Sequence, residues 1–289
     1  MIRYPFDEQQ VRTEIAAIDP NWAQKAAERT RKFLELGRYD EASSIWSTVK
    51  PVYMRLQHYK CIYCERQFED EEVGTIEHDL EHFRPKGAVD VWPDPQRHTF
   101  HYDFPTGSAS AAGYYWLAYD LLNYCAACKV CNSIYKLNWF PIAAQRLAAP
   151  SDIGQLQAEQ ALLCYPLGNL DDDPEDLISF SATTAIPVHT SGRKHQRAKA
   201  IIDFFGLNTR QQLHIQRAQF ICLFGYAFEK RHKGEADARD LALLAQIRSP
   251  ELPHSACLRA FARTWDEKPA LAKEIFAQCK AFISSRLHS

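Results

Sequence analysis

The feature of this 289-residue sequence that most constrains its fold is a pair of Cys-x-x-Cys motifs, Cys61 with Cys64 and Cys128 with Cys131. Four thiolates from two such motifs are typical of a closed, tetrahedral structural zinc site. The sequence therefore predicts a zinc-stapled core in which one ion fastens two distant segments together. Four buried thiols without a metal would show the same spacing. Cys125 lies near the second motif and is a fifth candidate ligand.

The remaining cysteine usage indicates a reducing environment. The chain has nine cysteines, and an odd number with clustered pairs argues against a disulfide framework. The first residues lack the apolar core of a secretory signal, and no run approaches the roughly 20 apolar residues of a membrane span. We therefore expect a cytoplasmic protein without a membrane segment. A thiol redox protein using Cys61 and Cys64 remains an alternative.

A second group of residues has the chemistry of phosphodiester hydrolysis. Glu81 and His82 are adjacent, Asn123 precedes the second cysteine motif, and Asn132 follows it directly. A neutral histidine can deprotonate water near pH 7. Glu81 and Asn132 supply oxygen atoms, which favours Mg²⁺ or Mn²⁺ over Zn²⁺ as a catalytic cation. Because neighbouring residues of a strand point to opposite faces, Glu81 and His82 need a bent backbone to share one site.

The net charge of −2 provides no overall positive field, so a nucleic-acid site must be a local basic patch or be completed by a partner. The basic side chains near the two motifs are candidate phosphate contacts, although each could equally be a solvated surface charge. They are Arg84, Lys86, Lys129 and Lys136.

Three further histidines leave alternatives open. His78 follows Glu77 and duplicates the Glu-His pair, so either His78 or His82 could be the base, and Phe83-Arg84-Pro85-Lys86 favours His82. His98 and His101 lie in a Pro- and Gly-rich segment, 87–113, that we expect to be a long ordered loop. Both are more simply explained as ordinary loop histidines than as metal ligands.

Hydrophobic periodicity predicts helices at both ends of the chain. We expect a helical segment over 1–57, a core over 58–145 and a mostly helical region over 146–289. Asp19-Pro20 is a candidate helix start, and Pro51 should kink or break the helix that contains it. Asn208 is a candidate N-cap. Residues 75–78 should form a short strand, and further helices are expected from 132, from 197, over 236–248 and over 268–287.

The motifs resemble those of HNH endonucleases with a zinc-bound ββα-metal (His-Me finger) fold. The resemblance rests on Cys-x-x-Cys, D-L-E-H-F-R-P-K, Y-W-L-A-Y-D-x-x-N, C-x-x-C-N-x-x-x-K and F-P, which span roughly residues 60–142. The wording of these blocks is most similar to the PtuB-like HNH proteins of Septu and retron-linked antiphage systems. The implied fold class is α+β, with a ββα-metal core wrapped by helical amino- and carboxy-terminal segments.

The resemblance also implies roles for individual residues. His82 would be the general base, Asn123 would orient the histidine loop, and Asn132 would bind the catalytic cation. Glu81 stands where many relatives carry a metal-binding aspartate. An ATPase (PtuA-like) partner and a nucleic-acid substrate are likewise implied. The rival interpretation is a zinc-stabilised binding module whose HNH site is inactive.

Overall fold

A computed structural model describes residues 1–69, 74–147 and 150–286. Its described residues form two compact units. One unit comprises residues 3–63 and 67–172, and the other comprises 1–2, 64–66 and 173–289. The expected boundaries at 57/58 and 145/146 both fall inside the first of these units. None of the described helices is long and apolar enough to cross a lipid bilayer.

In the unit of residues 3–63 and 67–172, helical elements precede the first strand. Its elements in chain order are α1 (Glu8–Ile18), α2 (Trp22–Leu36), η1 (Trp46–Val49), α3 (Lys50–Leu56), α4 (Gly74–Glu77), β1 (His78–His82), η2 (Tyr115–Leu117), η3 (Leu121–Asn123), β2 (Tyr124–Cys128), η4 (Val130–Lys136) and η5 (Gln155–Glu159). Pro51 occupies the first turn of α3 rather than a kink, because the missing amide hydrogen costs nothing there.

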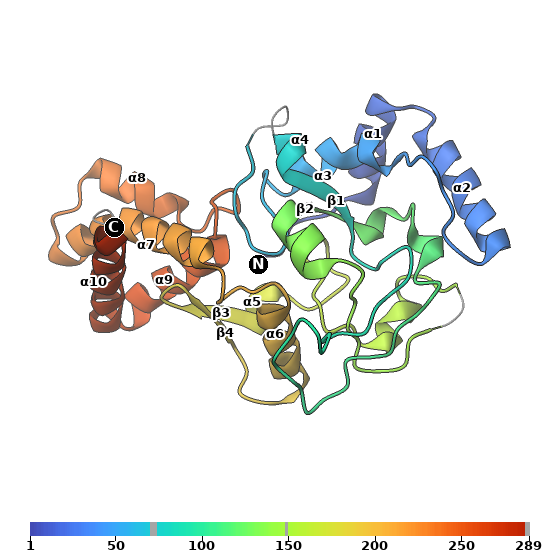
Figure 1. Cartoon of the computed structure of the whole chain (residues 1–289). Coiled ribbons are helices and arrows are strands. Elements are labelled where there is room, and N and C mark those ends of the chain that lie inside the picture. Colours follow the sequence, from blue (N-terminus) through green and yellow to red (C-terminus); the bar gives the residue numbers. More distant parts are fainter. Residues whose placement is uncertain (70–73, 148–149, 287–289) are drawn as a thin grey trace. The chain divides into compact units, whose positions relative to one another are not determined.

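The centre of this unit is a two-stranded antiparallel sheet of β1 and β2 (Figure 1). His78 lies opposite Cys128 and His82 lies opposite Tyr124. Every residue of β2 is buried. The expected strand over 75–78 is wrong for its first residues, because Gly74–Glu77 form one helical turn and the strand starts at His78. The sheet is followed by the π-helical segment η4, so the local order is strand, strand, helix.

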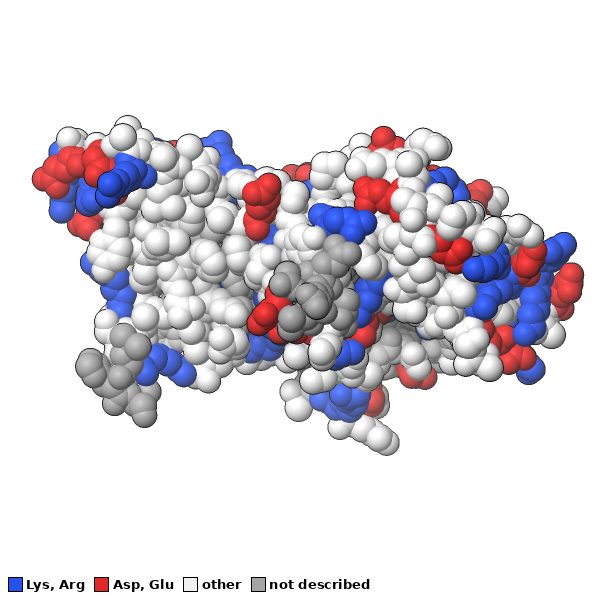
Figure 2. Space-filling view, turned by 90° about the horizontal axis from the view of Figure 1, so that it is seen from above, with Lys and Arg blue, Asp and Glu red and all other residues white. Residues whose placement is uncertain are grey.

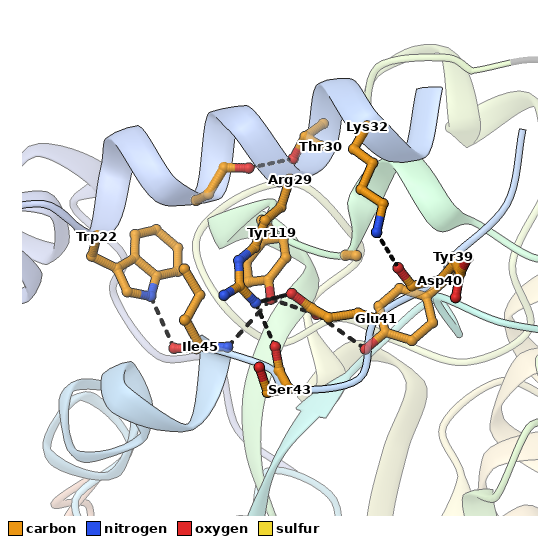
Figure 3. A network of polar contacts seen from close by, with 12 residues as sticks. Trp22, Arg29, Thr30, Lys32, Tyr39, Asp40, Glu41, Ser43, Ile45 and Tyr119 are labelled. Atoms are coloured by element: carbon orange, nitrogen blue, oxygen red, sulfur yellow. Dashed lines mark hydrogen bonds and ion pairs between the residues drawn. The ribbon is translucent and has the colours of Figure 1, made fainter. Parts of the chain in front are cut away.

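A polar network fastens α2 to the segment that leads into η1 (Figure 3). The Arg29 guanidinium pairs with Glu41 and donates to the Ser43 carbonyl, while the Tyr119 hydroxyl donates to Glu41 at 2.7 Å. The Trp22 indole donates to the Ile45 carbonyl at 3.0 Å. These contacts fix the backbone immediately before η1, which carries one wall of the cleft described below.

The other unit combines a β-hairpin with helices. Its elements are α5 (Pro174–Leu177), β3 (Ile178–Ser181), β4 (Thr184–Pro187), α6 (Gly192–Phe204), α7 (Gln211–Lys233), α8 (Ala238–Gln246), α9 (Ser255–Glu267) and α10 (Pro269–Arg286). An apolar cluster between α7, α9 and α10 includes Phe224, Phe228, Phe261, Trp265 and Phe276. The mixed helix and small-sheet class expected from the sequence is confirmed, and α9 is a helix that periodicity did not reveal.

The expected N-cap at Asn208 is wrong. Its side-chain amide instead accepts from the Ala185 amide and donates to the Ala185 carbonyl, both at 2.8 Å, so it pairs with the edge of β4. Helix α7 begins later, with Arg210 as its N-cap and no side-chain capping bond. An amide that meets a strand edge satisfies two backbone groups, whereas a cap satisfies one.

One buried histidine, His254, links the stability of the protein to pH. Burial lowers the pKa of His254 to about 4, and the nearby positive charge of Arg217 lowers it further. Because the unfolded chain takes up this proton near pH 6.5, the free energy of unfolding should fall as the pH drops from 6.5 towards 4, by about 3 kcal/mol. We expect His254→Asn, which tolerates the left-handed backbone there, to lose less stability over this range than wild type. Urea unfolding at pH 7 and pH 4.5 measures the difference. Equal losses in both proteins would contradict the prediction.

Candidate metal centre and cleft

Four cysteines gather at one place in the structure. The sulfur atoms of Cys61, Cys64, Cys128 and Cys131 all lie within 4.8 Å of one another, and all four residues are buried. The segment carrying the first motif is held against β2 by the buried amide of Gln57. That amide accepts from the Ala126 backbone at 2.7 Å and donates to its carbonyl at 2.8 Å. The segment before Cys61 and strand β2, which are far apart in sequence, are therefore joined by a pair of hydrogen bonds between one side-chain amide and one backbone residue.

The donor set of this cluster fits a structural zinc ion. Backbone amides donate to two of the sulfurs, from Cys128 to Cys61 Sγ at 3.3 Å and from Cys131 to Cys128 Sγ at 3.4 Å. Such bonds favour the thiolate form that zinc requires. Four buried sulfurs at this spacing suit tetrahedral coordination, because zinc binds thiolates at about 2.3 Å. The prediction of a four-cysteine site that could hold a metal such as zinc is confirmed at this level.

Cys125 is not a member of the cluster. It lies on β2 with its sulfur 3.6 Å from the Tyr63 hydroxyl, and burial raises its pKa well above the ordinary value. Its sulfur is not among the four that lie within 4.8 Å of one another. The structure therefore favours a core-packing role for this fifth candidate.

A polar cleft lies beside β1 and η4 and collects most of the residues singled out from the sequence. It is lined by Trp46, Ser47 and Lys50 of η1 and α3, by 79–82 of β1, by 85–87, and by Asn132, Ser133, Lys136, Leu137 and Asn138. Glu81, His82 and Asn132 are thus brought together, with Lys86 and Lys136 in the same walls. Asn123, Arg84 and Lys129 are not part of this lining.

His82 is held in one orientation by its surroundings. Its Nε2 lies 3.0 Å from the Ala118 carbonyl, which can only accept, so Nε2 carries the proton. The ring meets Trp46 and Tyr124 edge to face, each at 5.1 Å between centroids. Within the described chain Nδ1 makes no hydrogen bond. Burial lowers the pKa of His82 well below its ordinary value and Lys86 adds to the effect, so the ring is neutral and Nδ1 has a free lone pair.

Asn123 ties together the two segments on which His82 depends. Its side chain accepts from the Arg84 amide at 2.8 Å and donates to the Arg84 and Leu117 carbonyls at 3.0 and 3.1 Å. The first two bonds fix the chain just after His82. The third fixes the residue before Ala118, the carbonyl partner of the imidazole. This placement suits the orienting role that the sequence resemblance implies for Asn123.

Glu81 and Lys136 form a buried ion pair. The Lys136 ammonium lies 2.6 Å from Glu81 Oε1, and the side chains are 1% and 7% exposed, respectively. The same ammonium donates to the His82 carbonyl at 3.2 Å. Burial raises the pKa of Glu81 and the charge of Lys136 opposes that rise. Lys136 is therefore a counter-ion for Glu81 and the anchor of the η4 helix on β1.

Asp79 is the residue that the sequence analysis missed. It accepts from the Asn132 amide at 3.0 Å and from the Lys129 ammonium at 2.8 Å. Partial burial raises the pKa of Asp79, but the hydrogen bonds from Lys129 and Asn132 outweigh this effect and hold the pKa below its usual value. Strand alternation could have found it, because Asp79 and Glu81 are two residues apart and so share a face of β1.

The basic candidates occupy different environments. The Lys86 ammonium lies over the Trp46 ring at 4.5 Å, and burial lowers its pKa. Lys129 is half-exposed and pairs with Asp79. Arg84 differs from these. It is buried, pairs with Glu159 at 2.5 Å and lies over the Phe140 ring at 4.7 Å. We correct its assignment as a phosphate contact, because its charge is already neutralised inside the protein.

The alternative histidines lie away from the cleft. His78 is buried and stacks on Phe68 at 4.7 Å. Nδ1 of His98 accepts from the Asp94 amide at 3.0 Å, and its ring packs against Trp139. His101 is exposed in the 87–113 loop. These positions favour His82 over His78 as a base, and none of the three histidines joins the cysteine cluster.

Surface charge agrees with the small net charge. On the face of the described residues seen in Figure 2, basic and acidic side chains are interspersed among large uncharged areas. The lysines that line the cleft are Lys50, Lys86 and Lys136, and Lys136 is already paired with Glu81.

The fold and site define a mixed helix and small-sheet protein with a four-cysteine centre beside a polar cleft. The chain is similar to the Septu protein PtuB of Bacillus mycoides (strain KBAB4), with 30% identity over 174 residues. The match covers 60% of this chain and 50% of the relative, so the chain spans about half the length of the curated protein it matches. No family model and no solved structure shows a significant match.

Replacing a cluster cysteine should remove zinc. We expect about one zinc per chain in wild type, and Cys61→Ser or Cys131→Ser should lose it together with much of the thermal stability, because metal binding and folding are coupled. Cys125→Ala is the matched control, since it alters an equally buried cysteine outside the cluster. Zinc content by mass spectrometry and thermal unfolding provide the measurements. Zinc-free wild type, or equal zinc loss in the control, would contradict the assignment.

Breaking the buried pair from one side should be costly. Lys136→Met leaves the Glu81 carboxylate unpaired in the interior, which should lower the free energy of unfolding by roughly 3–5 kcal/mol. The double variant Lys136→Met with Glu81→Gln should recover a large part of that loss, because no charge is left buried alone. Urea unfolding of the four proteins measures the coupling. Additive losses would show that the two side chains do not form this pair.

Proposed function

We propose that this protein is a metal-dependent HNH-type endonuclease that hydrolyses phosphodiester bonds in nucleic acid, DNA or RNA. The observation that carries the proposal is the meeting of a fixed neutral imidazole, His82, and an amide, Asn132, in one polar cleft bordered by lysines. The strand, strand, helix order of β1, β2 and η4 supports interpreting this part as a ββα-metal core.

His82 would act as the general base. Its Nε2–H bond to Ala118 directs the basic Nδ1 away from that carbonyl, and burial keeps the ring neutral. A neutral imidazole with one free lone pair can accept a proton from an attacking water. Because Asn123 holds both the chain after His82 and the residue before Ala118, it would serve as a positioning residue.

Glu81 and Asn132 would hold a divalent cation, Mg²⁺ or Mn²⁺, as the sequence predicts. Both line the cleft, and carboxylate and amide oxygens are the ligands these cations prefer. When bound, such a cation neutralises charge on the scissile phosphate and the leaving oxygen. Lys86 and Lys129 would contact neighbouring phosphates. Lys136 would act mainly by holding Glu81, because its ammonium is buried.

The cysteine centre would position the catalytic groups without taking part in the chemistry. Cys128 ends β2 and Cys131 precedes Asn132, so a zinc ion bound there would fix the corner from which η4 presents its amide. Four zinc-bound thiolates are compatible with a reducing cytoplasm, where we propose that the protein works. A redox role for Cys61 and Cys64 fits less well, because both sulfurs belong to the cluster.

We further propose that the nuclease serves antiphage defence together with an ATPase (PtuA-like) partner. Two observations support this, the similarity to a Septu protein PtuB and the motif wording of the PtuB-like group. The small net charge also agrees with help from a partner in nucleic-acid binding. The competing function is a zinc-stabilised binding module with an inactive cleft.

Cleavage assays separate these two functions. With Mg²⁺ or Mn²⁺, and with the ATPase partner present, wild type should cut plasmid DNA or RNA, and His82→Ala should lower the rate by about 10²-fold or more. The matched control is His101→Ala, which removes an exposed histidine outside the cleft and should cut normally. Zinc content confirms that each variant is folded. Intact substrates with every protein, or equal rates for wild type and His82→Ala, would favour the binding module.

A further inference from the structure

The cleft contains two carboxylates, and each one meets a different lysine. Asp79 pairs with Lys129 at 2.8 Å, and their side chains are 28% and 53% exposed. Glu81 pairs with Lys136 at 2.6 Å, and their side chains are 7% and 1% exposed. Both acids lie on the same face of β1, so the two pairs differ mainly in depth.

The burial of each ion pair determines how easily a cation can replace the lysine on its carboxylate. An ion pair at the surface is weak, because water screens it and stabilises the released ammonium. A buried ammonium that loses its carboxylate has no water to replace that carboxylate. Lys136 also donates to the His82 carbonyl, so moving it would disturb the base. A cation entering the cleft can therefore displace Lys129 from Asp79 far more readily than Lys136 from Glu81.

Asn132 lies beside the accessible carboxylate. Its amide nitrogen donates to Asp79 Oδ2 at 3.0 Å, which places the whole carboxamide next to Asp79. The oxygen of the same carboxamide accepts no hydrogen bond within the described residues. Asp79 and Asn132 thus offer two neighbouring oxygen donors at the half-buried side of the cleft, the ligand type that Mg²⁺ and Mn²⁺ prefer.

We infer that Asp79 is the principal carboxylate ligand of the catalytic cation, next to Asn132, while Glu81 contributes less because Lys136 retains it. This inference rests on the proposed nuclease function, and it adds a residue to the ligand set predicted from the sequence. It also gives Lys129 a second state. When the cation binds Asp79, the Lys129 ammonium is released beside that carboxylate and can contact a phosphate.

Mn²⁺ binding tests the inference without relying on catalysis. Zinc-loaded protein is titrated with Mn²⁺, and free Mn²⁺ is followed by electron paramagnetic resonance. Asp79→Asn should weaken binding by about tenfold or more, since even the hydrogen-bonding partners of metal ligands contribute about that much. Glu81→Gln should weaken it by a clearly smaller factor. Lys129→Met should strengthen binding roughly two- to fivefold, because it removes the competing ammonium.

Asp79→Asn distinguishes a ligand from a residue that only supports the fold, since a purely structural Asp79 would leave the Mn²⁺ affinity of the folded variant unchanged. Zinc content and thermal unfolding show whether Asp79→Asn is folded. Equal Mn²⁺ affinity of Asp79→Asn and wild type, or a larger loss in Glu81→Gln, would overturn the inference and leave the cleavage result for His82→Ala untouched. Wild type that binds no Mn²⁺ would overturn both this inference and the proposed catalytic cation.

Discussion

The arrangement of this site depends on the meeting of four cysteine sulfurs from two distant segments. Gln57 and the Ala126 backbone bring the segments together, and the sulfurs close the contact within 4.8 Å. Without a cation, four buried thiolates would repel one another strongly. A cation bound by the four sulfurs would fix the end of β2 relative to the start of η4. Asn132 and Lys136 lie on η4 and line the cleft, so the cysteine cluster determines the positions of both side chains.

Inside the cleft, the depth of each charge determines what it can do. Lys136 is buried and neutralises Glu81, which ties η4 to β1 beside the His82 carbonyl. Asp79 and Lys129 lie further out, where charges exchange partners at little cost. His82 is kept neutral by burial between two aromatic rings. A site built in this way separates fixed groups, which position the base, from exchangeable groups, which can receive a cation and a phosphate.

Much of the site could be predicted from sequence because its signals are local. The cysteine spacing identified the cluster, and the adjacent motifs identified Glu81, His82 and Asn132, which the structure places in one cleft. Arg84 was misjudged because its partner Glu159 lies 75 residues away, and no local pattern reveals that pairing. Asn208 was misjudged for the same reason, since a strand edge competes with the helix for its amide. Asp79 was overlooked although strand alternation placed it on the same face as Glu81.

The account rests on one claim, that the four sulfurs bind a single zinc ion. X-ray absorption at the zinc K-edge of the purified protein tests it most directly. We predict a single shell of four sulfur atoms at about 2.3 Å, with no nitrogen or oxygen ligand. A shell containing nitrogen or oxygen, or fewer than four sulfurs, would show that the cluster does not hold the metal as described and would contradict the account.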